Sequence, residues 1–412
     1  MKAGVLDLVI VGGGPAGIST ALHALAADPR AKLVVLEKER YPREKICAGG
    51  VGGRAFRILE RLGVEVPCPK VPLEAVAMRV GGETVVVREP GCGAVVRRVE
   101  FDHAFARAAM ARGVEVRDGC EVRALAVEDG AVRIETAAGE ALRARAVVGA
   151  DGVAGIVRRQ AGFPRGELRA QVAELDTEGA AIDLPRDTAV FDFATRGLRG
   201  YAWDFPTQVA GRPLVCRGAY LLRAPAGAPG TAPAARAAAP EPPQDGPTAR
   251  GVRDWLAAYL AERGLDLARY RLKQFAERGF EPGAEIARPR VLLVGEAAGI
   301  DIATGEGIGQ AIEYGAVAGP YLARALAEDD LGFADWRRAV ERHHLGWQLG
   351  IRHGCYRAFY GRRRPTIERL MPRLTALFRL GVQDFAGAPM SKLAMVQGAA
   401  QFLAAFTRAK LA

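Results

Sequence analysis

The sequence is poor in residues that bind metals or form cross-links, with six cysteines and five histidines among 412 residues. The cysteines, at positions 47, 68, 92, 120, 216 and 355, include no C-x-x-C pair and no spacing typical of zinc ligands. We therefore expect no metal site and no disulfide framework. Free thiols in this number fit a reducing cytoplasm.

Long apolar runs are also missing, because no stretch approaches the ~20 residues that a helix needs to span a bilayer. The apolar run from Val5 to Val11 is too short for the core of a secretory signal and continues into glycines, so it predicts a buried strand. Any contact with a membrane is then expected to be peripheral, at its inner face.

The excess of positive charge, +10 at pH 7, identifies no partner. A basic surface attracts anionic lipid head groups, phosphorylated substrates and nucleic acid alike, and arginine-rich coding is a simpler explanation. We expect no nucleic-acid partner.

The composition that remains is that of a globular protein, 50% hydrophobic and 25% charged, and the length predicts more than one domain. We expect an α/β fold. Its Rossmann-like lobe comprises residues 1–70, 97–165 and 286–330. A substrate lobe with an antiparallel sheet comprises residues 71–96 and 166–285, and a helical segment follows at 331–412. Within the second lobe, residues 224–248 are rich in Ala and Pro and predict a flexible loop.

Hydrophobic periodicity places the elements. Val5–Val11 predicts a strand, Pro15–Ala27 a helix and Lys32–Glu37 a second strand, which together form a β-α-β unit. A glycine-rich loop is expected at 47–53, helices at 54–62, 101–112 and 307–327, a hairpin at 75–87, and strands at 121–128, 131–136, 142–149 and 290–295. Between 168 and 222 polar and apolar residues alternate, which is typical of an antiparallel sheet with one covered face.

A G-x-G-x-x-G pattern lies between the first strand and the first helix. Glycines let the backbone approach a pyrophosphate, and the helix N-terminus offers it N–H groups and a positive dipole end. An acid at the end of the next strand can accept hydrogen bonds from ribose hydroxyls. The pattern predicts a dinucleotide site without separating FAD from NAD. Its residues are Gly12, Gly14, Pro15, Ala16, Gly17, Glu37 and Lys38.

Two later strand ends resemble the flavin-binding segments of the glutathione-reductase-like FAD proteins, which include aromatic hydroxylases, halogenases and geranylgeranyl reductases. One ends in Asp151-Gly152, and in the other Glu296 follows Gly295. The resemblance implies FAD as the cofactor and a carboxylate after Gly295 that contacts its ribityl or ribose-phosphate part. Most members have Asp where this chain has Glu296, so the side chain is one methylene longer.

Four further segments resemble the geranylgeranyl reductase family. They are the loop 42–50, similar to P-x-x-K-x-C-G-G; Tyr201–Pro206, which matches Y-x-W-x-F-P; Thr304–Ile308, similar to G-E-G-I; and Arg98 with Phe101 and Asp102, similar to R-x-x-F-D. The resemblance extends from residue 5 to about residue 330. It implies that the cofactor is also contacted by Cys47, Ala48, Gly49, Arg98, Asp151, Gly152, Gly295, Glu296, Gly305, Gly307 and Ile308.

Alternation along a strand predicts that Tyr201, Trp203 and Phe205 project from one face as an aromatic wall, with Ala202 and Asp204 on the other. Such a wall suits a long apolar substrate, although aromatic stripes also fill ordinary cores. In some archaeal relatives the cysteine of this loop lies against the flavin, and the resemblance implies the same for Cys47. A thiol there can give a proton to one alkene carbon while reduced flavin gives hydride to its neighbour. The alternative is an inert small residue.

The function that the resemblance implies is an FAD-dependent reductase that saturates C=C bonds of an isoprenoid chain, either a geranylgeranyl lipid or a quinone side chain. The polyprenyl substrate and an external electron donor, NAD(P)H or ferredoxin, are the expected partners. A flavin monooxygenase or halogenase is the first alternative, and a non-catalytic flavin or prenyl-lipid carrier is the second. Apolar residues at helical spacing between Lys392 and Lys410 predict a helix that rests on a membrane surface or packs on the lobes.

Overall fold

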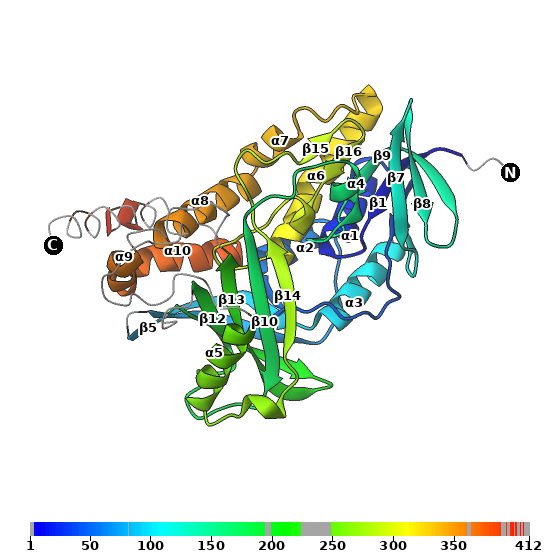
Figure 1. Ribbon diagram of the computed structural model, residues 1–412. Coiled ribbons are helices and arrows are strands. Elements are labelled where there is room, and N and C mark those ends of the chain that lie inside the picture. Colours follow the sequence, from blue (N-terminus) through cyan, green and yellow to red (C-terminus); the bar gives the residue numbers. More distant parts are fainter. Residues whose placement is uncertain are drawn as a thin grey trace, which may run out of the picture.

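A computed structural model describes residues 4–80, 82–193, 199–223, 249–360 and 364–388, together with eight positions between 393 and 407. The predicted loop at 224–248 and most of the predicted helix at 392–410 lie outside the described residues. Two sheets and their helices form the molecule (Figure 1).

The strands of the first sheet are β1 (Leu6–Val11), β2 (Leu33–Leu36), β6 (Glu115–Arg117), β7 (Val122–Glu128), β8 (Ala131–Thr136), β9 (Ala141–Gly149), β15 (Ala287–Arg288) and β16 (Val291–Leu293). Their order is β15-β16-β9-β1-β2-β6, with β7 and β8 continuing from β9 as an antiparallel ribbon. The pairs β16/β9, β9/β1, β1/β2 and β2/β6 are parallel. Parallel strands buried on both faces explain why β1, β2 and the end of β9 are almost continuously apolar.

The strands of the second sheet are β3 (Gly50–Gly52), β4 (Lys70–Val80), β5 (Glu83–Val96), β10 (Arg169–Thr177), β11 (Thr188–Asp192), β12 (Gly200–Val209), β13 (Arg212–Arg223) and β14 (Lys273–Arg278). They follow the order β14-β10-β13-β12-β11-β4-β5-β3. All pairs are antiparallel except β11/β4. The expected α/β fold with an antiparallel second sheet is therefore confirmed.

The helices are α1 (Pro15–Ala27), α2 (Gly53–Arg61), α3 (Arg98–Met110), α4 (Ile156–Gln160), α5 (Ala249–Ala261), α6 (Ile308–Glu328), α7 (Trp336–Arg342), α8 (His344–Phe359), α9 (Arg364–Leu370) and α10 (Thr375–Ala386), with short 3-10 turns η1 (Leu267–Arg269), η2 (Gly295–Ala297) and η3 (Met371–Arg373). Helices α1 and α6 cross closely. A side chain on Gly315 or Gly319 of α6 would overlap Ser19 or His23 of α1.

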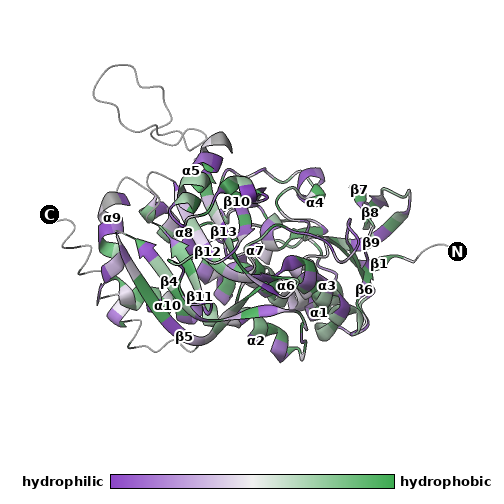
Figure 2. Cartoon of the chain, turned by 90° about the horizontal axis from the view of Figure 1, so that it is seen from below, coloured by the Kyte–Doolittle hydropathy of each residue, from purple (hydrophilic) through white to green (hydrophobic). Residues whose placement is uncertain are grey.

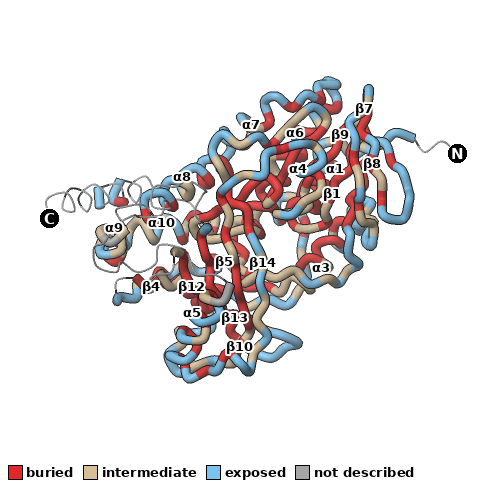
Figure 3. Tube along the Cα trace, viewed as in Figure 1, coloured by how far each residue is buried: buried red, intermediate tan, exposed pale blue. Residues whose placement is uncertain are grey.

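Burial follows the two sheets, whose strands form the buried interior beneath exposed helix faces (Figure 3). The interior is also where hydrophobic residues gather in the view from below (Figure 2). One core surrounds the parallel strands with α1 and α6, and a second surrounds one face of the antiparallel sheet. The C-terminal helices α8 and α10 supply Tyr356, Val382 and Ala386 to the second core.

Several predicted elements differ in detail from the structure. The expected loop at 47–53 contains β3, because its backbone pairs with β5. The hairpin expected at 75–87 extends over 70–96, and α3 begins at Arg98 rather than at Phe101. Strand β6 and helix α5 were not predicted. Arg290, expected within a strand, adopts a left-handed conformation with φ 64° at the turn into β16.

Candidate active site

The three strand ends marked by motifs meet at one edge of the parallel sheet. Gly12 has φ +107°, and a Cβ atom on it would lie 2.9 Å from the Cα of Asp151. A Cβ on Gly295 would lie 2.6 Å from the Cβ of Ala16, and one on Gly152 would lie 3.6 Å from the Oε2 of Glu296. Segments separated by up to 284 residues in sequence therefore form one site, because β1, β9 and β16 are parallel neighbours.

The start of α1 carries positive charge. Gly14 is the N-cap, makes no side-chain cap and is followed by Pro15 at the first helical position. A Cβ on Gly14 would lie 3.8 Å from the Nη2 of Arg43 and 3.9 Å from the Nη2 of Arg98. Two guanidinium groups and a helix N-terminus thus converge on the glycine turn, which is an environment that favours a pyrophosphate.

Carboxylates hold these arginines. Arg43 pairs with Glu37 at 3.3 Å and with Asp102 at 2.9 Å. Arg98 donates to both oxygens of Asp102 at 2.6 and 2.7 Å. Asp102 was named in the sequence only as part of a family motif, and its position on α3, one turn after Arg98, explains that motif physically.

Glu37 accepts a hydrogen bond from the N–H of Gly13 at 2.9 Å and from the N–H of Glu39 at 3.1 Å. It lies at the end of β2, as the sequence predicts. Lys38 does not join the site, since its side chain is 66% exposed and lies 3.7 Å from Glu39.

The other two strand ends contribute carboxyl groups with unused atoms. Asp151 accepts from the N–H of Val157 at 2.9 Å, whereas its Oδ1 is buried without a partner among the described residues. Burial raises the pKa of Asp151 to about 6. The Oε1 of Glu296 is likewise shielded from solvent and unpartnered among those residues, although Glu296 keeps some exposed surface.

These residues fit FAD. Because its glycines carry no side chains, the turn lets a phosphate approach the backbone, and the two arginines can donate hydrogen bonds to it. The unpartnered carboxyl oxygens can accept from ribose or ribityl hydroxyls. Among the described residues no group of three or more His, Cys, Asp and Glu side chains is placed to hold a metal ion.

The cysteine of the 42–50 loop reaches the junction between the two lobes. The Cys47 N–H donates to the Oε1 of Glu174 on β10 at 3.1 Å, and the Gly49 N–H donates to the Cys47 sulfur at 3.4 Å. Burial raises the pKa of the Cys47 thiol, and the charge of Arg98 opposes this only in part. The thiol therefore stays protonated at neutral pH, which suits a proton donor better than a nucleophile.

Glycines in the same loop bring it against the second sheet. Gly49 has φ +82°, and a side chain there would overlap the backbone of Val96. A Cβ on Gly50 would lie 3.1 Å from the Cε2 of Phe205. Ala48 packs at the edge of the second core.

Tyr201, Trp203 and Phe205 project from one face of β12, as alternation predicts. Tyr201 stacks on Tyr220 with ring centroids 5.0 Å apart, and Phe191 contacts both Tyr201 and Phe205. Their exposed fractions are 3%, 3% and 8%, so the wall is packed into the second core in this structure. An apolar chain reaches these rings only if neighbouring side chains move apart.

The turn before α6 lies on this wall. The Tyr201 hydroxyl donates to the carbonyl oxygen of Thr304, and a Cβ on Gly305 would lie 2.8 Å from that hydroxyl. Gly307 is the N-cap of α6, which begins at Ile308. The predicted residues of the 304–308 segment and those of the wall are thus in contact.

Sequence reasoning missed residues that reach the site from distant segments. Arg352 of α8 pairs with Asp301 at 2.7 Å and with Glu306 at 2.6 Å, which fixes the turn before α6. Glu174 and Glu277 lie on β10 and β14. A carboxyl group in a strand gives no local signal of this kind, because alternation shows which residues of the strand share a face but not what that face packs against.

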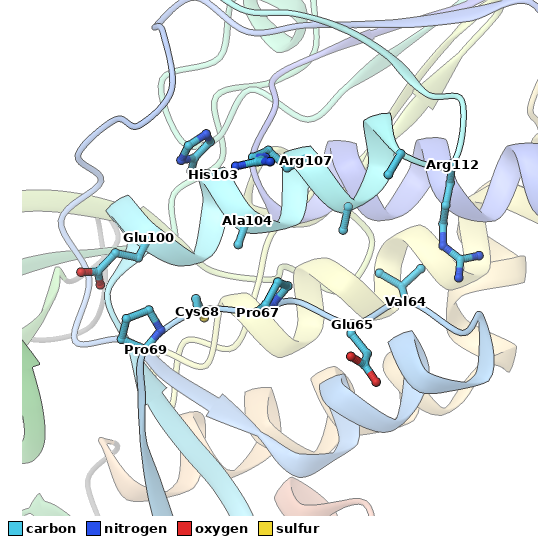
Figure 4. A pocket seen from close by; sticks show the side chains of 12 residues that line it. Val64, Glu65, Pro67, Cys68, Pro69, Glu100, His103, Ala104, Arg107 and Arg112 are labelled. Carbon is cyan, nitrogen blue, oxygen red and sulfur yellow. The ribbon is translucent and has the colours of Figure 1, made fainter.

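A groove of about 800 Å³ lies between α3 and residues 64–69 (Figure 4). Glu100, His103, Ala104 and Arg107 line it from α3, and Pro67 and Cys68 lie opposite Ala104 (Figure 4). None of its lining residues is a predicted site residue.

The chain is similar to known flavoproteins. Residues 5–197 match the model of an FAD binding domain. Digeranylgeranylglycerophospholipid reductase 1 of Methanococcoides burtonii is 26% identical over 361 residues, which cover 83% of this chain and 79% of the relative.

Solved structures show the same fold. A geranylgeranyl bacteriochlorophyll reductase-like protein from Thermoplasma acidophilum matches with TM-score 0.65 and 18% identity, covering 96% of this chain and 95% of the other. The flavin-dependent brominase Bmp2 matches with TM-score 0.71 and 16% identity, covering 99% and 100%.

Proposed function

We propose that this chain, which is similar to FAD-binding proteins and among them to geranylgeranyl reductases, saturates C=C bonds of an isoprenoid chain. The observation that carries the proposal is that the loop of Cys47 lies against the second sheet: the Cys47 N–H donates to Glu174 on β10, and Gly50 lies against Phe205 on the aromatic face of β12. A geranylgeranyl lipid or the side chain of a quinone is the substrate class.

In this proposal reduced FAD supplies a hydride to one alkene carbon. The residues that hold it are those of the three strand ends, with Arg43 and Arg98 at the pyrophosphate. Cys47 gives its thiol proton to the neighbouring carbon, so that a C–H bond forms as the S–H bond breaks. Tyr201, Trp203 and Phe205 align the apolar chain and exclude water from the reacting carbons.

Two electrons must enter for each bond that is saturated. An external donor, NAD(P)H or ferredoxin, supplies them. The lipid substrate would reach the protein from a membrane surface, and exposed apolar side chains near the C-terminus, Trp347, Ile351, Leu393 and Val396, support that approach. No helix among the described residues is long and apolar enough to cross a bilayer.

The test is to reduce the FAD-loaded protein anaerobically and incubate it with a geranylgeranyl lipid and with menaquinone. Mass spectrometry should find products that have gained one pair of hydrogen atoms per saturated bond. Cys47→Ala should lower the turnover number about 10²–10⁴-fold, the usual contribution of a general acid. Cys120→Ala, which changes a cysteine in the connection between β6 and β7, is the matched control and should keep full activity.

Other products would contradict the proposal. Oxygenated or halogenated products under air would favour the monooxygenases and halogenases that share the fold. A protein whose bound FAD is reduced but never passes hydride to an alkene would favour a carrier. Full activity of Cys47→Ala would remove Cys47 from the mechanism.

A further inference from the structure

The turn before α6, residues 301–307, is held by a cation that comes from the C-terminal helices. The Nη1 of Arg352, on α8, lies 2.7 Å from the Oδ2 of Asp301 and 2.6 Å from the Oε2 of Glu306. It also donates to the hydroxyl oxygen of Thr304 at 3.2 Å. Asp301 and Glu306 form no other ion pair with any residue that the structure describes, so Arg352 alone balances their charges there.

Asp301 passes this ion pair on to the backbone of the turn. Its carboxylate accepts from the N–H of Ala303 at 2.7 Å, from the N–H of Thr304 at 3.2 Å and from the Thr304 hydroxyl. The Asp301 side chain is buried, so water is not at hand to replace a lost partner. Without Arg352 this anion would stay buried with no cation, a costly state that favours rearrangement of the turn.

The same turn joins the two halves of the candidate site. On one side, the Thr304 carbonyl oxygen accepts from the Tyr201 hydroxyl, and a Cβ on Gly305 would lie 2.9 Å from the Cε2 of Tyr220. On the other side, Gly307 is the N-cap of α6, and both Gly305 and Gly307 are predicted to contact FAD. A shift of the turn would therefore change the contacts of the aromatic wall and those of the cofactor together.

Helix α10 fixes the direction from which Arg352 reaches the turn. The Nη2 of Arg352 lies 3.7 Å from the Oδ2 of Asp384 on α10, and Gln348 of α8 donates to the same oxygen at 2.6 Å. Asp384 also pairs with Arg54 of α2 at 2.6 Å and with His344 of α8 at 2.9 Å. Helices α8 and α10, which lie side by side, are thus tied to each other and to α2 (Figure 1).

We propose that Arg352 is a positioning residue of the site. From α8 it sets the shape of the 301–307 turn, and through the turn it sets the contacts made to FAD and to the aromatic wall. This gives a role to α8, which lies outside the residues 5–197 that match the FAD binding domain. The expected effect on turnover rests on the proposed function, whereas the expected effects on the turn and on FAD binding do not.

The first test follows the turn itself in FAD-free protein by hydrogen–deuterium exchange and mass spectrometry. Arg352→Gln should speed exchange in the peptide that contains Ala303 and Thr304, because the acceptor of their N–H groups loses its cation. Arg357→Gln, which changes an exposed arginine of the same helix, is the matched control and should exchange like wild type. Exchange at the wild-type rate in Arg352→Gln would overturn the proposal.

The second test measures FAD binding. Arg352→Gln should weaken FAD binding about three- to tenfold, the equivalent of about one hydrogen bond, and should shift the visible absorbance bands of bound FAD. Arg357→Gln should change neither the affinity nor the bands. An FAD affinity and a spectrum like those of wild type in Arg352→Gln would contradict the positioning role.

A milder variant keeps the proposal testable if Arg352→Gln folds poorly. Arg352→Lys keeps a cation that can face Asp301 and Glu306 but loses the nitrogen that faces Asp384, so it should recover most of the FAD affinity. An affinity as low in Arg352→Lys as in Arg352→Gln would mean that the cation does not hold the turn.

Turnover completes the test through a double-mutant cycle. Arg352→Gln should lower kcat about 10–10²-fold and change KM less, because the reacting groups are misplaced while the apolar substrate keeps its contacts. Tyr201→Phe removes the other bond to the turn. The double variant should therefore lose at least about twofold less than the product of the two single effects.

Arg357→Gln combined with Tyr201→Phe is the control cycle and should give the simple product. A simple product for Arg352→Gln with Tyr201→Phe would refute coupling through the turn. If wild type saturates no alkene, the proposed function fails, while hydrogen exchange and FAD affinity still decide whether Arg352 positions the turn.

Discussion

The two faces of the antiparallel sheet treat buried carboxyl groups in opposite ways. On the outer face, beneath α5, Asp204 is 4% exposed and accepts from Arg217 at 2.8 Å, from Arg263 at 2.8 Å and from the Tyr259 hydroxyl at 3.0 Å. On the inner face, towards the strand ends, Glu174 and Glu277 form no ion pair with any residue that the structure describes.

Buried charges that stabilise the fold are therefore distinguished by the cations paired with them. Asp204 of β12 forms ion pairs with Arg217 and Arg263 and accepts a hydrogen bond from Tyr259. Its carboxylate therefore links β12 to β13 and α5. Glu174 and Glu277 are held close to neutrality by burial, which raises the pKa of Glu174 to about 7 and that of Glu277 to about 8. Groups poised near neutral pH in a site are typical of proton transfer, whereas matched ions are typical of structure.

The largest effect on stability is expected when Asp204 loses its ion pairs with Arg217 and Arg263. Asp204→Ala removes the anion from two buried guanidinium groups, Arg217 and Arg263, and should lower the free energy of unfolding by about 3–5 kcal/mol. Urea unfolding followed by circular dichroism measures it. Asp187→Ala, which breaks an exposed pair with Arg88, is the control and should change stability little. If the free energy of unfolding fell as little in Asp204→Ala as in Asp187→Ala, the ion pairs of Asp204 would not stabilise the fold.

A smaller effect, a gain in stability, is expected on the inner face when Glu174 is replaced by Gln. The folded-state pKa of Glu174, about 7, lies above its ordinary value of 4.5, so the stability that it contributes is complete below pH 4.5 and is lost as pH rises through 7. Glu174→Gln stays neutral and should therefore be more stable than wild type at pH 8, by on the order of 3 kcal/mol. Thermal unfolding of both proteins at pH 5 and pH 8 checks this. Parallel pH dependence in the two proteins would show that Glu174 is ionised throughout.

The smallest effect is expected at acid pH, from Asp183, which is paired with Arg217. Burial opposes ionisation of Asp183, but hydrogen bonds from Arg217 at 2.6 and 2.9 Å outweigh it and lower the pKa of Asp183. The stability from this group is thus present above pH 3.8 and is lost as pH falls below that value. Asp183→Asn should flatten the acid limb of the stability profile by about 1 kcal/mol, because part of the group is screened by solvent. Acid unfolding of both proteins between pH 5 and pH 2 measures it, and a limb of unchanged slope would contradict the assignment.

Site residues that lie close together in the sequence could be predicted from it, whereas residues from distant segments could not. The Gly12–Gly17 turn, Pro15 and Glu37 belong to one β-α-β unit, in which local spacing fixes the geometry. The wall residues were predictable because alternation alone sets the face of a strand. Arg43, Arg352 and Glu277 were not assigned to the site, because nothing local distinguishes them from solvated charges.

Patterns within short segments were enough to predict the parallel β-α-β start, the three strand ends that carry the cofactor motifs and the shared face of Tyr201, Trp203 and Phe205. Three-dimensional packing was needed to show that the wall is packed rather than open, that Asp204 is paired with Arg217 and Arg263, and that Glu277 shares a face with Tyr201 and Tyr220. Strand register and helix docking join residues over long sequence separations, and the free energy that selects them comes from burial summed over both sheets.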